Sequence, residues 1–315
     1  MPESVGNRWS HPSIILVATD LSDLDRLMPF ALEQGAATGA RLILLHAVST
    51  GETMAADAAG MPYYDPAGAI DLASKTLAPA CEIARKRGII CDQVVREGHP
   101  AQLILTAARQ FRADRIILGT RSRGRVSRLL LGSVAEQVLR SVNIPVITVG
   151  PEAHLPVEGN QPERVVLHAT TLRETSRPSA VLASHIASAL DARLVLLHVL
   201  PHIPEMERLG LSTGLDSDAM QQLRALAIAS GCGARVRVEP KVAHGDPCIE
   251  ILAESSERHA CLIVLGATHR SAFENLTRDR TIYKVLAHAR CPVMTLREPQ
   301  VKDEQSELAH IAAHS

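Results

Sequence analysis

Residues 41–47 read Arg41-Leu-Ile-Leu-Leu-His-Ala47, and nearly the same stretch returns as Arg193-Leu-Val-Leu-Leu-His-Val199. Each stretch is a short aliphatic run, which is typical of a strand buried on both faces of a parallel sheet. A repeat of this kind determines the architecture of the whole chain, so the segments on either side of the two runs matter most.

Four further pairs of segments extend the repeat over most of the 315 residues. They are Ile15–Leu21 with Val166–Leu172, Glu97–Pro100 with His244–Pro247, Asp114–Gly119 with Cys261–Gly266, and Ile144–Val149 with Cys291–Leu296. We therefore predict one domain over residues 1–150, a linker over 151–162, a second domain over 163–297 and a polar tail over 298–315. The first copy is longer, and its extra residues at Ser49–Pro66, rich in Gly, Ala and Pro, predict a loop.

Aliphatic and amphipathic segments alternate within each copy. The first copy predicts strands near 14–18, 41–47, 90–96, 115–119 and 145–149, with helices near 24–38, 68–87, 100–111 and 132–141. The second copy repeats the strands near 164–168, 193–199, 235–242, 261–265 and 292–296. Strands that alternate with helices form right-handed crossovers and parallel sheets. The predicted fold is α/β, with two Rossmann-like (HUP-type) open parallel five-stranded sheets in tandem and helices on both faces of each.

Composition limits the class of protein. Apolar residues make up 46% of the chain and aromatic residues 2%, so the core must be built from Ala, Val, Ile and Leu. A formal charge of −1 gives no strong field toward nucleic acid or an anionic membrane, and we expect neither as a partner. No apolar run approaches the ~18 residues that span a bilayer, and no segment has the order of a signal peptide. We expect a cytoplasmic protein.

Cysteine and histidine usage predicts neither disulfides nor a metal site. The six cysteines show no CxxC pair, and several lie in aliphatic stretches, which favours buried, reduced thiols. They are Cys81, Cys91, Cys232, Cys248, Cys261 and Cys291. The fourteen histidines show no metal-binding spacing, so no metal site is assigned.

Asp20 follows the first predicted strand of the first copy. Ligands of open α/β sheets bind beyond the carboxyl ends of the strands, so Asp20 is placed to accept hydrogen bonds from ribose hydroxyls. The alternative is structural, because Asp20-Leu-Ser-Asp23 is also a good capping sequence for the next helix.

Two further segments end at the same edge of the sheet. Gly119 opens a basic loop with Arg121, Arg123, Arg125 and Arg128, which either balances phosphate charge or is an ordinary solvated loop. Gly132-Ser133-Val134 opens a helix whose unpaired N–H groups and positive dipole end form an anion site, unless Ser133 serves only as its N-cap.

The combination is more specific than its parts. Gly119, Ser122, Gly132 and Ser133 occupy the positions of the pattern Gly-x2-Gly-x9-Gly-Ser/Thr, the phosphate motif of the universal stress protein family. Flanking segments such as Leu129–Val138 also look typical of that family. The chain resembles the family over nearly all of residues 12–150 and more faintly over 163–297.

The resemblance implies an adenine nucleotide, ATP or ADP or AMP with or without Mg²⁺, bound by the first copy. The implied binding residues are Ala18, Thr19, Asp20, Ala47, Leu118, Gly119, Arg121, Ser122, Gly132, Ser133 and Val134. Asp20 would bind the ribose or the adenine edge, Ala47 would meet adenine through its backbone, and the helix start would hold phosphates. Ser122 departs from the motif glycine, which affects the detail of phosphate contact.

The second copy lacks these features. Thr171 stands in place of Asp20, and Asp279-Arg280 stands where the first copy has Gly132-Ser133. An aspartate aimed at a triphosphate adds repulsion, so we expect the second copy to bind no nucleotide. Single domains of the family pair through their last strand. This implies a pseudo-dimer within the chain, with Val146–Val149 beside Val293–Leu296, and a homodimer of tandem chains.

Three functions remain open from sequence. The first is an ATP-binding regulator of the stress response. The second is a slow ATPase that uses Asp20 and Mg²⁺. The sequence argues against it, because it has no Walker lysine, no second carboxylate at a matching position and no evident general base. His46 is interpreted as a packed core residue, and no catalytic residue is assigned. The third is a nucleotide-free scaffold, which Ser122 favours.

Overall fold

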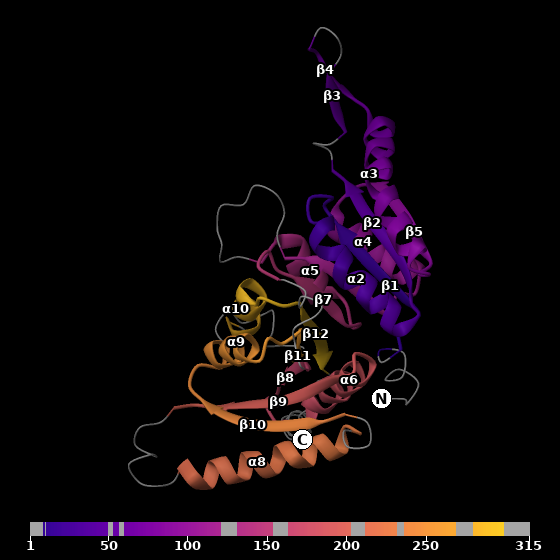
Figure 1. The fold of residues 1–315 in the computed structure, drawn as a ribbon. Coiled ribbons are helices and arrows are strands. Elements are labelled where there is room, and N and C mark those ends of the chain that lie inside the picture. Colours follow the sequence, from indigo (N-terminus) through magenta and orange to yellow (C-terminus); the bar gives the residue numbers. More distant parts are fainter. Residues whose placement is uncertain are drawn as a thin grey trace, which may run out of the picture.

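The computed structural model describes residues 9, 11–49, 53–56, 60–120, 131–153, 163–202, 212–231, 236–268 and 280–298. Strands and helices alternate twice along the chain, as the aliphatic and amphipathic segments predict (Figure 1). The first half contains β1 (Ile14–Thr19), α2 (Leu24–Thr38), β2 (Arg41–Val48), β3 (Met54–Ala56), β4 (Pro62–Tyr64), α3 (Pro66–Lys86), β5 (Cys91–Glu97), α4 (Pro100–Gln110), β6 (Arg115–Gly119), α5 (Ser133–Ser141) and β7 (Val146–Val149).

The second half repeats this order, and its described residues contain no counterpart of the β3–β4 pair. It contains β8 (Arg164–Ala169), the 3-10 turn η1 (Glu174–Ser176), α6 (Arg177–Ala189), β9 (Ala192–Leu200), α8 (Ser212–Ala229), β10 (Val238–His244), α9 (Pro247–Glu257), β11 (Leu262–Thr268), α10 (Arg280–His288) and β12 (Val293–Glu298). Every strand predicted in this half is present within a few residues of its predicted position.

The two five-stranded parallel sheets are joined into one ten-stranded sheet. Its strand order is β10-β9-β8-β11-β12-β7-β6-β1-β2-β5, and the β7–β12 pair in the middle is antiparallel. Ile147 lies opposite Met294, so the two segments that were expected to pair, Val146–Val149 and Val293–Leu296, do so. The Thr148 hydroxyl donates to the Val293 carbonyl at 3.2 Å across the junction. Each half thereby covers an apolar edge strand of the other, which would otherwise invite uncontrolled pairing.

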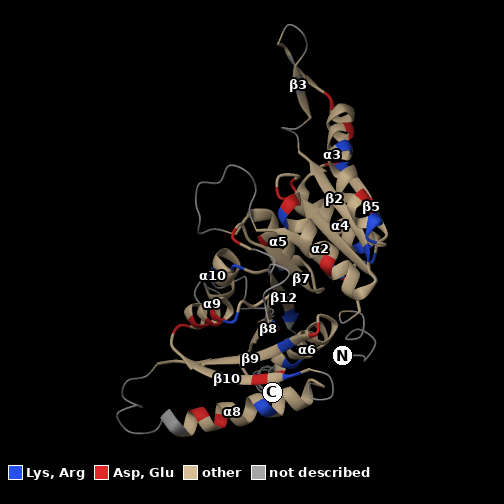
Figure 2. Ribbon diagram, in the orientation of Figure 1, with Lys and Arg blue, Asp and Glu red and all other residues tan. Residues whose placement is uncertain are grey.

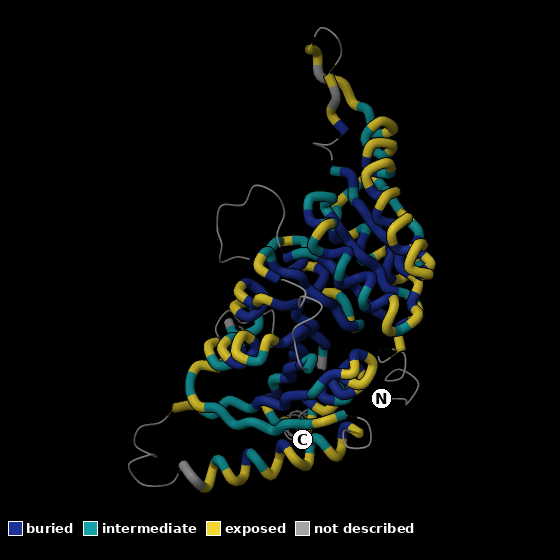
Figure 3. Tube along the Cα trace, in the orientation of Figure 1, coloured by how far each residue is buried: buried dark blue, intermediate teal, exposed yellow. Residues whose placement is uncertain are grey.

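The core forms two layers, one on each face of the sheet, because successive side chains of a strand point to opposite faces. Ile15 and Val17 of β1 belong to the layer beneath α2, α3, α6 and α8, whereas Leu16 and Ala18 belong to the layer beneath α4, α5, α9 and α10. Each layer continues across the β7–β12 junction, and the central strands of the sheet are the most buried part of the molecule (Figure 3).

The segment Ser49–Pro66 corrects the sequence prediction. It was expected to be a loop, but β3 and β4 pair as an antiparallel hairpin with Met54 opposite Tyr64. The hairpin stands beyond the end of the main sheet (Figure 1). Gly, Ala and Pro obscured the alternating pattern of such short strands. Asp65 then accepts a hydrogen bond from the Gly68 N–H at 2.8 Å and caps α3, which begins at Pro66.

Charge is distributed unevenly over the outer helices, and α9 carries Glu250, Glu254 and Glu257 without a lysine or arginine. Acidic and basic residues are intermingled on α3 and α8 (Figure 2). An ion pair between Glu33 of α2 and Arg164 of β8 joins the two halves. Five of the six cysteines lie in the described part and are free and buried, as expected, while Cys232 lies outside it. Among the described helices, none combines the length and apolarity needed to cross a bilayer.

Candidate functional site

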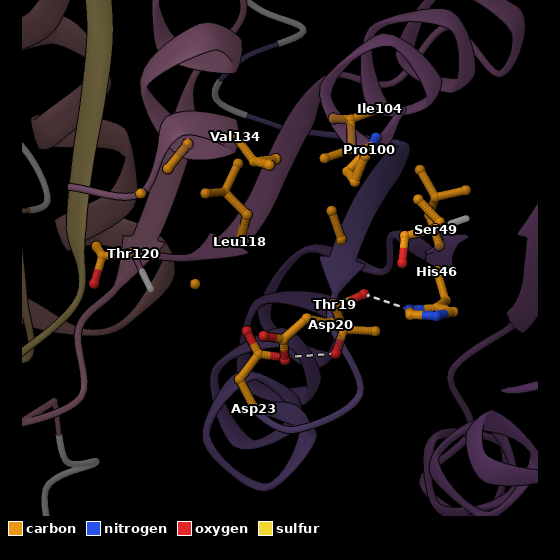
Figure 4. Close-up of a pocket in the computed structure, with 16 residues that line it drawn as sticks. Thr19, Asp20, Asp23, His46, Ser49, Pro100, Ile104, Leu118, Thr120 and Val134 are labelled. Carbon is orange, nitrogen blue, oxygen red and sulfur yellow. Dashed lines mark hydrogen bonds between the residues drawn. The ribbon is translucent and has the colours of Figure 1, made fainter. Parts of the chain in front are cut away.

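A cavity of about 440 Å³ opens at the carboxyl ends of β1, β2 and β6, beside the start of α4 and α5 (Figure 4). Its lining is formed by Ala18, Thr19, Asp20, Asp23, Leu45, His46, Ala47, Ser49, Pro100, Ile104, Leu118, Gly119, Thr120, Gly132, Val134 and Ala135. From β1 the chain proceeds to β2 on one side, and β6 lies on the other. The cavity therefore lies at the point where the strand order reverses, which is the usual ligand site of such sheets.

Asp20 is half-buried at the mouth of this cavity. One of its carboxylate oxygens accepts hydrogen bonds from the Ser22 N–H at 2.9 Å and from the Ser22 hydroxyl at 2.6 Å. The N-cap of α2 is Asp23, so the alternative in which Asp20 caps the helix is wrong. Asp20 belongs instead to a tight turn that holds its carboxylate at the end of β1.

The turn is strained at Leu21, whose φ of 70° lies in the left-handed region that side chains rarely adopt. Two interactions hold it there. The Leu21 N–H donates to the Thr19 hydroxyl oxygen at 2.9 Å, and the Leu21 side chain packs against the core. A residue held in this way is over-determined by its surroundings.

Asp23 is a cavity residue that the sequence did not single out. It is buried, and its carboxylate accepts a hydrogen bond from the Thr19 hydroxyl at 2.6 Å. Burial raises the pKa of Asp23 to about 6; the charge of Asp20 adds to this rise and the Thr19 hydrogen bond opposes it. Asp23 was overlooked because Asp20-Leu-Ser-Asp23 also matches a capping sequence.

His46 is both packed and part of the site. Its side chain is buried, as predicted, and it also lines the cavity. The ring Nδ1–H donates to the Thr19 carbonyl at 3.0 Å, so β1 and β2 are tied together where they reach the cavity (Figure 4).

The far wall is formed by the end of β6 and the start of α5. The Gly132 N–H donates to the Thr120 carbonyl at 2.7 Å, and the Glu136 N–H donates to the Gly132 carbonyl at 2.9 Å. Gly132 is the N-cap and Ser133 the first helical residue, so the alternative in which Ser133 caps the helix is wrong. The N–H groups of the first turn have no acceptor within the helix, and this turn faces the cavity through Val134 and Ala135.

Thr120 adds an unusual feature at this wall. Its hydroxyl oxygen is buried and has no hydrogen-bond partner among the described residues. Buried polar groups are nearly always paired, so this hydroxyl is available to a partner outside the described residues.

The cavity brings together eight of the eleven residues assigned from sequence. They are Ala18, Thr19, Asp20, Ala47, Leu118, Gly119, Gly132 and Val134. Ser133 begins α5 but is not part of the lining, while Arg121 and Ser122 lie outside the described residues. Leu45 and Ile104 were not assigned, although Leu45 lies two residues before Ala47 on the same face of β2.

The second half builds the same turn with a different side chain. Leu172 has a φ of 58°, its N–H donates to the Thr170 hydroxyl at 3.1 Å, and His198 donates to the Thr170 carbonyl at 2.9 Å. Thr171 replaces Asp20 and places its hydroxyl 3.0 Å from that of Ser176. The carboxylate at the strand end is therefore missing from an otherwise matching turn.

The two domains also differ at the far wall, which in the first domain is formed by the end of β6 and the start of α5. β6 ends at Gly119, whereas β11 continues past Gly266 to Thr268, with Ala267 opposite Arg297 of β12. Asp279 lies outside the described residues, and α10 begins at Arg280.

Comparison with known proteins agrees with this geometry. The model of the universal stress protein family matches residues 13–150 and again residues 163–297. The chain belongs to the universal stress protein family. It carries two such domains in tandem, of which the first holds the cavity.

Individual relatives resemble one or both domains. A universal stress protein of Thermus aquaticus is 34% identical over 139 residues, which are 43% of this chain and 96% of that protein. A solved universal stress protein of Archaeoglobus fulgidus DSM 4304 covers 92% of this chain and 98% of its own, with a TM-score of 0.68 and 20% identity, and shows the shared fold. A universal stress protein solved in complex with cAMP covers 43% of this chain and 98% of its own, with a TM-score of 0.37 and 16% identity.

Proposed function

We propose that the N-terminal domain binds an adenine nucleotide, with ATP as the first candidate. Occupancy of the cavity would serve as a regulatory signal in a stress response. The observation that carries this proposal is the placement of Asp20 and the first turn of α5 on opposite walls of one cavity. The walls offer the two chemistries that a nucleotide needs, a carboxylate for the ribose and N–H groups for the phosphates.

The middle of the cavity supports the same assignment. Leu45, Ile104 and Leu118 give it an apolar part between the two polar walls. Its volume of about 440 Å³ lies in the range of cofactor sites, which run from about 300 to 1,000 Å³. An apolar slot of this kind suits a purine ring, with the backbone of Ala47 at its edge. The complex of a family member with cAMP is a precedent for an adenine nucleotide on this fold.

The phosphate wall depends on the small size of Gly132. The φ of −64° and ψ of 144° at Gly132 are open to any residue, so its backbone does not require glycine. A side chain at this position would project beside the unpaired N–H groups of the first helical turn. We infer that glycine is present to let phosphate oxygens approach the backbone closely.

The proposal assigns one nucleotide to each chain. In the C-terminal domain Thr171 offers no carboxylate, and β11 occupies the space beyond Gly266 with two more paired residues. Asp279, which stands in the sequence where Gly132 stands, would add negative charge beside the phosphates. This domain would then serve to complete the shared sheet and core.

Isothermal titration of ATP into a Gly132→Val variant tests the assignment. We expect affinity to fall at least tenfold, with an unchanged circular dichroism spectrum because the backbone at this position accepts valine. The matched control is Gly214→Val on α8, where a new Cβ has no atom within 4 Å and ATP binding should persist. Parental affinity in Gly132→Val would refute the phosphate site, and absence of binding in the parent would favour a nucleotide-free scaffold.

One observation favours a second candidate, a slow ATPase. Asp23 supplies a second carboxylate beside Asp20, and such a pair could hold Mg²⁺ against the phosphates. Single-turnover hydrolysis of labelled ATP with Mg²⁺ separates the two candidates. A rate near that of ordinary enzymes, lost in Asp23→Asn, would support the ATPase.

A further inference from the structure

Two cysteine sulfurs are in contact inside the N-terminal domain, away from the nucleotide cavity. The Cys91 thiol donates a hydrogen bond to the Cys81 sulfur, with 3.2 Å between the two sulfur atoms. Cys81 lies on the buried face of α3 and Cys91 is the first residue of β5, and each is only 1% exposed. Neither residue lines the cavity.

The connection between α3 and β5 holds the two sulfurs together. The Ile89 N–H donates to the Ala84 carbonyl at 3.0 Å, which closes the end of the helix, and Gly88 makes the turn with a φ of +76°. The Arg85 guanidinium then donates to the Cys91 carbonyl at 2.7 Å and ties the start of β5 back to α3. The contact is therefore a consequence of a short, well-bonded turn.

We propose that Cys81 and Cys91 are a redox modification site, at which a hydroperoxide converts the two thiols into a reversible intramolecular disulfide. This goes beyond the nucleotide function and does not depend on it. Sulfurs already in contact need only a small displacement to reach bonding distance, so the disulfide would form without rearranging α3 or β5.

The two thiols differ in chemical character. The pKa of Cys81 is lowered, mainly because the Cys91 S–H donates to its sulfur and further because Arg85 is nearby, while burial and Asp92 oppose this. The same hydrogen bond raises the pKa of Cys91, and burial raises it further. Cys81 is therefore the nucleophile and Cys91 the resolving thiol.

The reaction balances with peroxide as the oxidant. The Cys81 thiolate attacks one peroxide oxygen, the O–O bond breaks, and the released hydroxide takes up a proton to leave as water. The Cys81 sulfenic acid then reacts with the Cys91 thiol, which forms the S–S bond and releases a second water. Two thiols and one hydrogen peroxide give one disulfide and two waters, and an added dithiol reverses the change.

Access to the buried pair comes from the edge of the molecule. β5 is the last strand of the sheet, with a single neighbour. Ile83 of α3 and Ile90 of the connecting turn are 49% and 67% exposed, so the segment around the pair has little covering it. Local opening is easiest at such edges, and it would admit a molecule as small as hydrogen peroxide.

The other described cysteines provide internal controls. Burial raises the pKa of Cys261 to about 11 and that of Cys291 to about 12, and it also raises the pKa of Cys248. These three thiols are about as buried as the pair, and for each of them burial is the largest influence on the pKa, outweighing the positive charge of Arg164 beside Cys261. They should stay reduced under conditions that oxidise Cys81 and Cys91.

The test is oxidation of the full chain with a small excess of hydrogen peroxide, alkylation in denaturant and peptide mass spectrometry. We expect one disulfide-linked peptide pair containing Cys81 and Cys91 in most chains, its loss after dithiothreitol, and alkylated Cys248, Cys261 and Cys291. We also expect the oxidised chain to melt roughly 5 °C higher, since the bond restricts the unfolded state.

Two variants isolate the roles of the thiols. In Cys91→Ala, which keeps the site apolar, a dimedone-reactive sulfenic acid should accumulate on Cys81. The control Cys261→Ala should leave the disulfide unchanged. The proposal is overturned if Cys81 and Cys91 remain alkylatable after free glutathione in the same tube is oxidised, or if Cys81 reaches sulfinic acid without a crosslink. If a variant fails to fold, the oxidation experiment on the parent chain still distinguishes the expected disulfide from these two contrary results.

Discussion

The turn after β1 and the turn after β8 show what duplication preserves and what it does not. Both have a left-handed leucine, Leu21 or Leu172, whose N–H donates to a threonine hydroxyl and whose side chain packs on the core. The two turns differ at the residue just before the leucine, since Asp20 presents a carboxylate and Thr171 a hydroxyl. The two turns share this backbone conformation, whereas the side chain that lines the cavity in the first domain is replaced in the second.

The fourth strands of the two parallel half-sheets, β6 and β11, extend this contrast. The chain leaves the sheet at Gly119 in the first domain and makes a wall of the cavity there. In the second domain the strand continues to Thr268 and gains pairing with β12. The second domain therefore has two more paired residues at the corresponding edge, as expected of a copy that contributes stability.

The largest expected effect tests whether the two domains form one cooperative unit. Ile147 and Met294 lie opposite each other at the β7–β12 junction and belong to one core layer. Because both are fully buried, Ile147→Ala and Met294→Ala should each lower the free energy of unfolding by about 3 kcal/mol. Urea unfolding followed by circular dichroism should show a single transition, and each substitution should shift its midpoint to lower urea. Two transitions, each sensitive to one variant, would mean that the domains are energetically independent.

Acidification should expose a difference between the two cores. His168 of β8 stands where the first domain has Val17, is fully buried, and donates from Nδ1 to the Val264 carbonyl at 3.0 Å. Burial lowers its pKa to about 4, so the unfolded chain takes up the proton first as pH falls. The parent should lose up to about 3 kcal/mol of stability between pH 6.5 and pH 4. In His168→Val, the urea midpoint should not fall in this way between pH 6.5 and pH 4. The same pH dependence in the variant and the parent would contradict the assignment of the loss to His168.

Asp23 should show the opposite dependence in the first domain. Its folded pKa of about 6 lies above the ordinary value of 3.8, so the stability it contributes is complete below pH 3.8 and is lost as pH rises through 6. Asp23→Asn removes this loss and should stabilise the chain by about 2 kcal/mol at pH 8 but hardly at pH 4. Melting temperatures at the two pH values measure it. An equal change at both would show that the carboxylate is not desolvated.

The smallest expected effect concerns the residue that distinguishes the two turns. Asp20→Asn should weaken ATP binding about tenfold, or about 1.4 kcal/mol, because a charge-assisted hydrogen bond becomes a neutral one. Thr171→Asp should create no second site, since β11 and Asp279 remain. Calorimetric titration of both variants gives affinity and stoichiometry together. A second binding event in Thr171→Asp would reduce the difference between the domains to one side chain.

Sequence predicted most of the fold because buried parallel strands need unbroken aliphatic runs, such as Leu42–Leu45, which few other structures share. It failed at β3–β4, where the strands are short and exposed and where Gly, Ala and Pro obscure the alternating pattern. It also failed at Asp23, because a helix-capping aspartate and a desolvated cavity aspartate look the same in a sequence. The two kinds of aspartate differ in burial, and the burial of Asp23 arises only once β1, α2 and the cavity are assembled.

The candidate site was predicted from the spacing of a family motif more than from composition. Gly119 and Gly132 belong to that motif, and the end of β6 lies near the start of α5 because β7 returns beside β6. The two extra residues of β11 could not be foreseen, since Gly266 suggests a strand end just as Gly119 does. Strand pairing with β12 overrides that local preference.

Native mass spectrometry of the intact chain with saturating ATP tests the central claim most directly, that one domain binds nucleotide and its copy does not. The account predicts a single added ATP per chain, absent in Gly132→Val. Two nucleotides per chain, or one that persists in that variant, would contradict it.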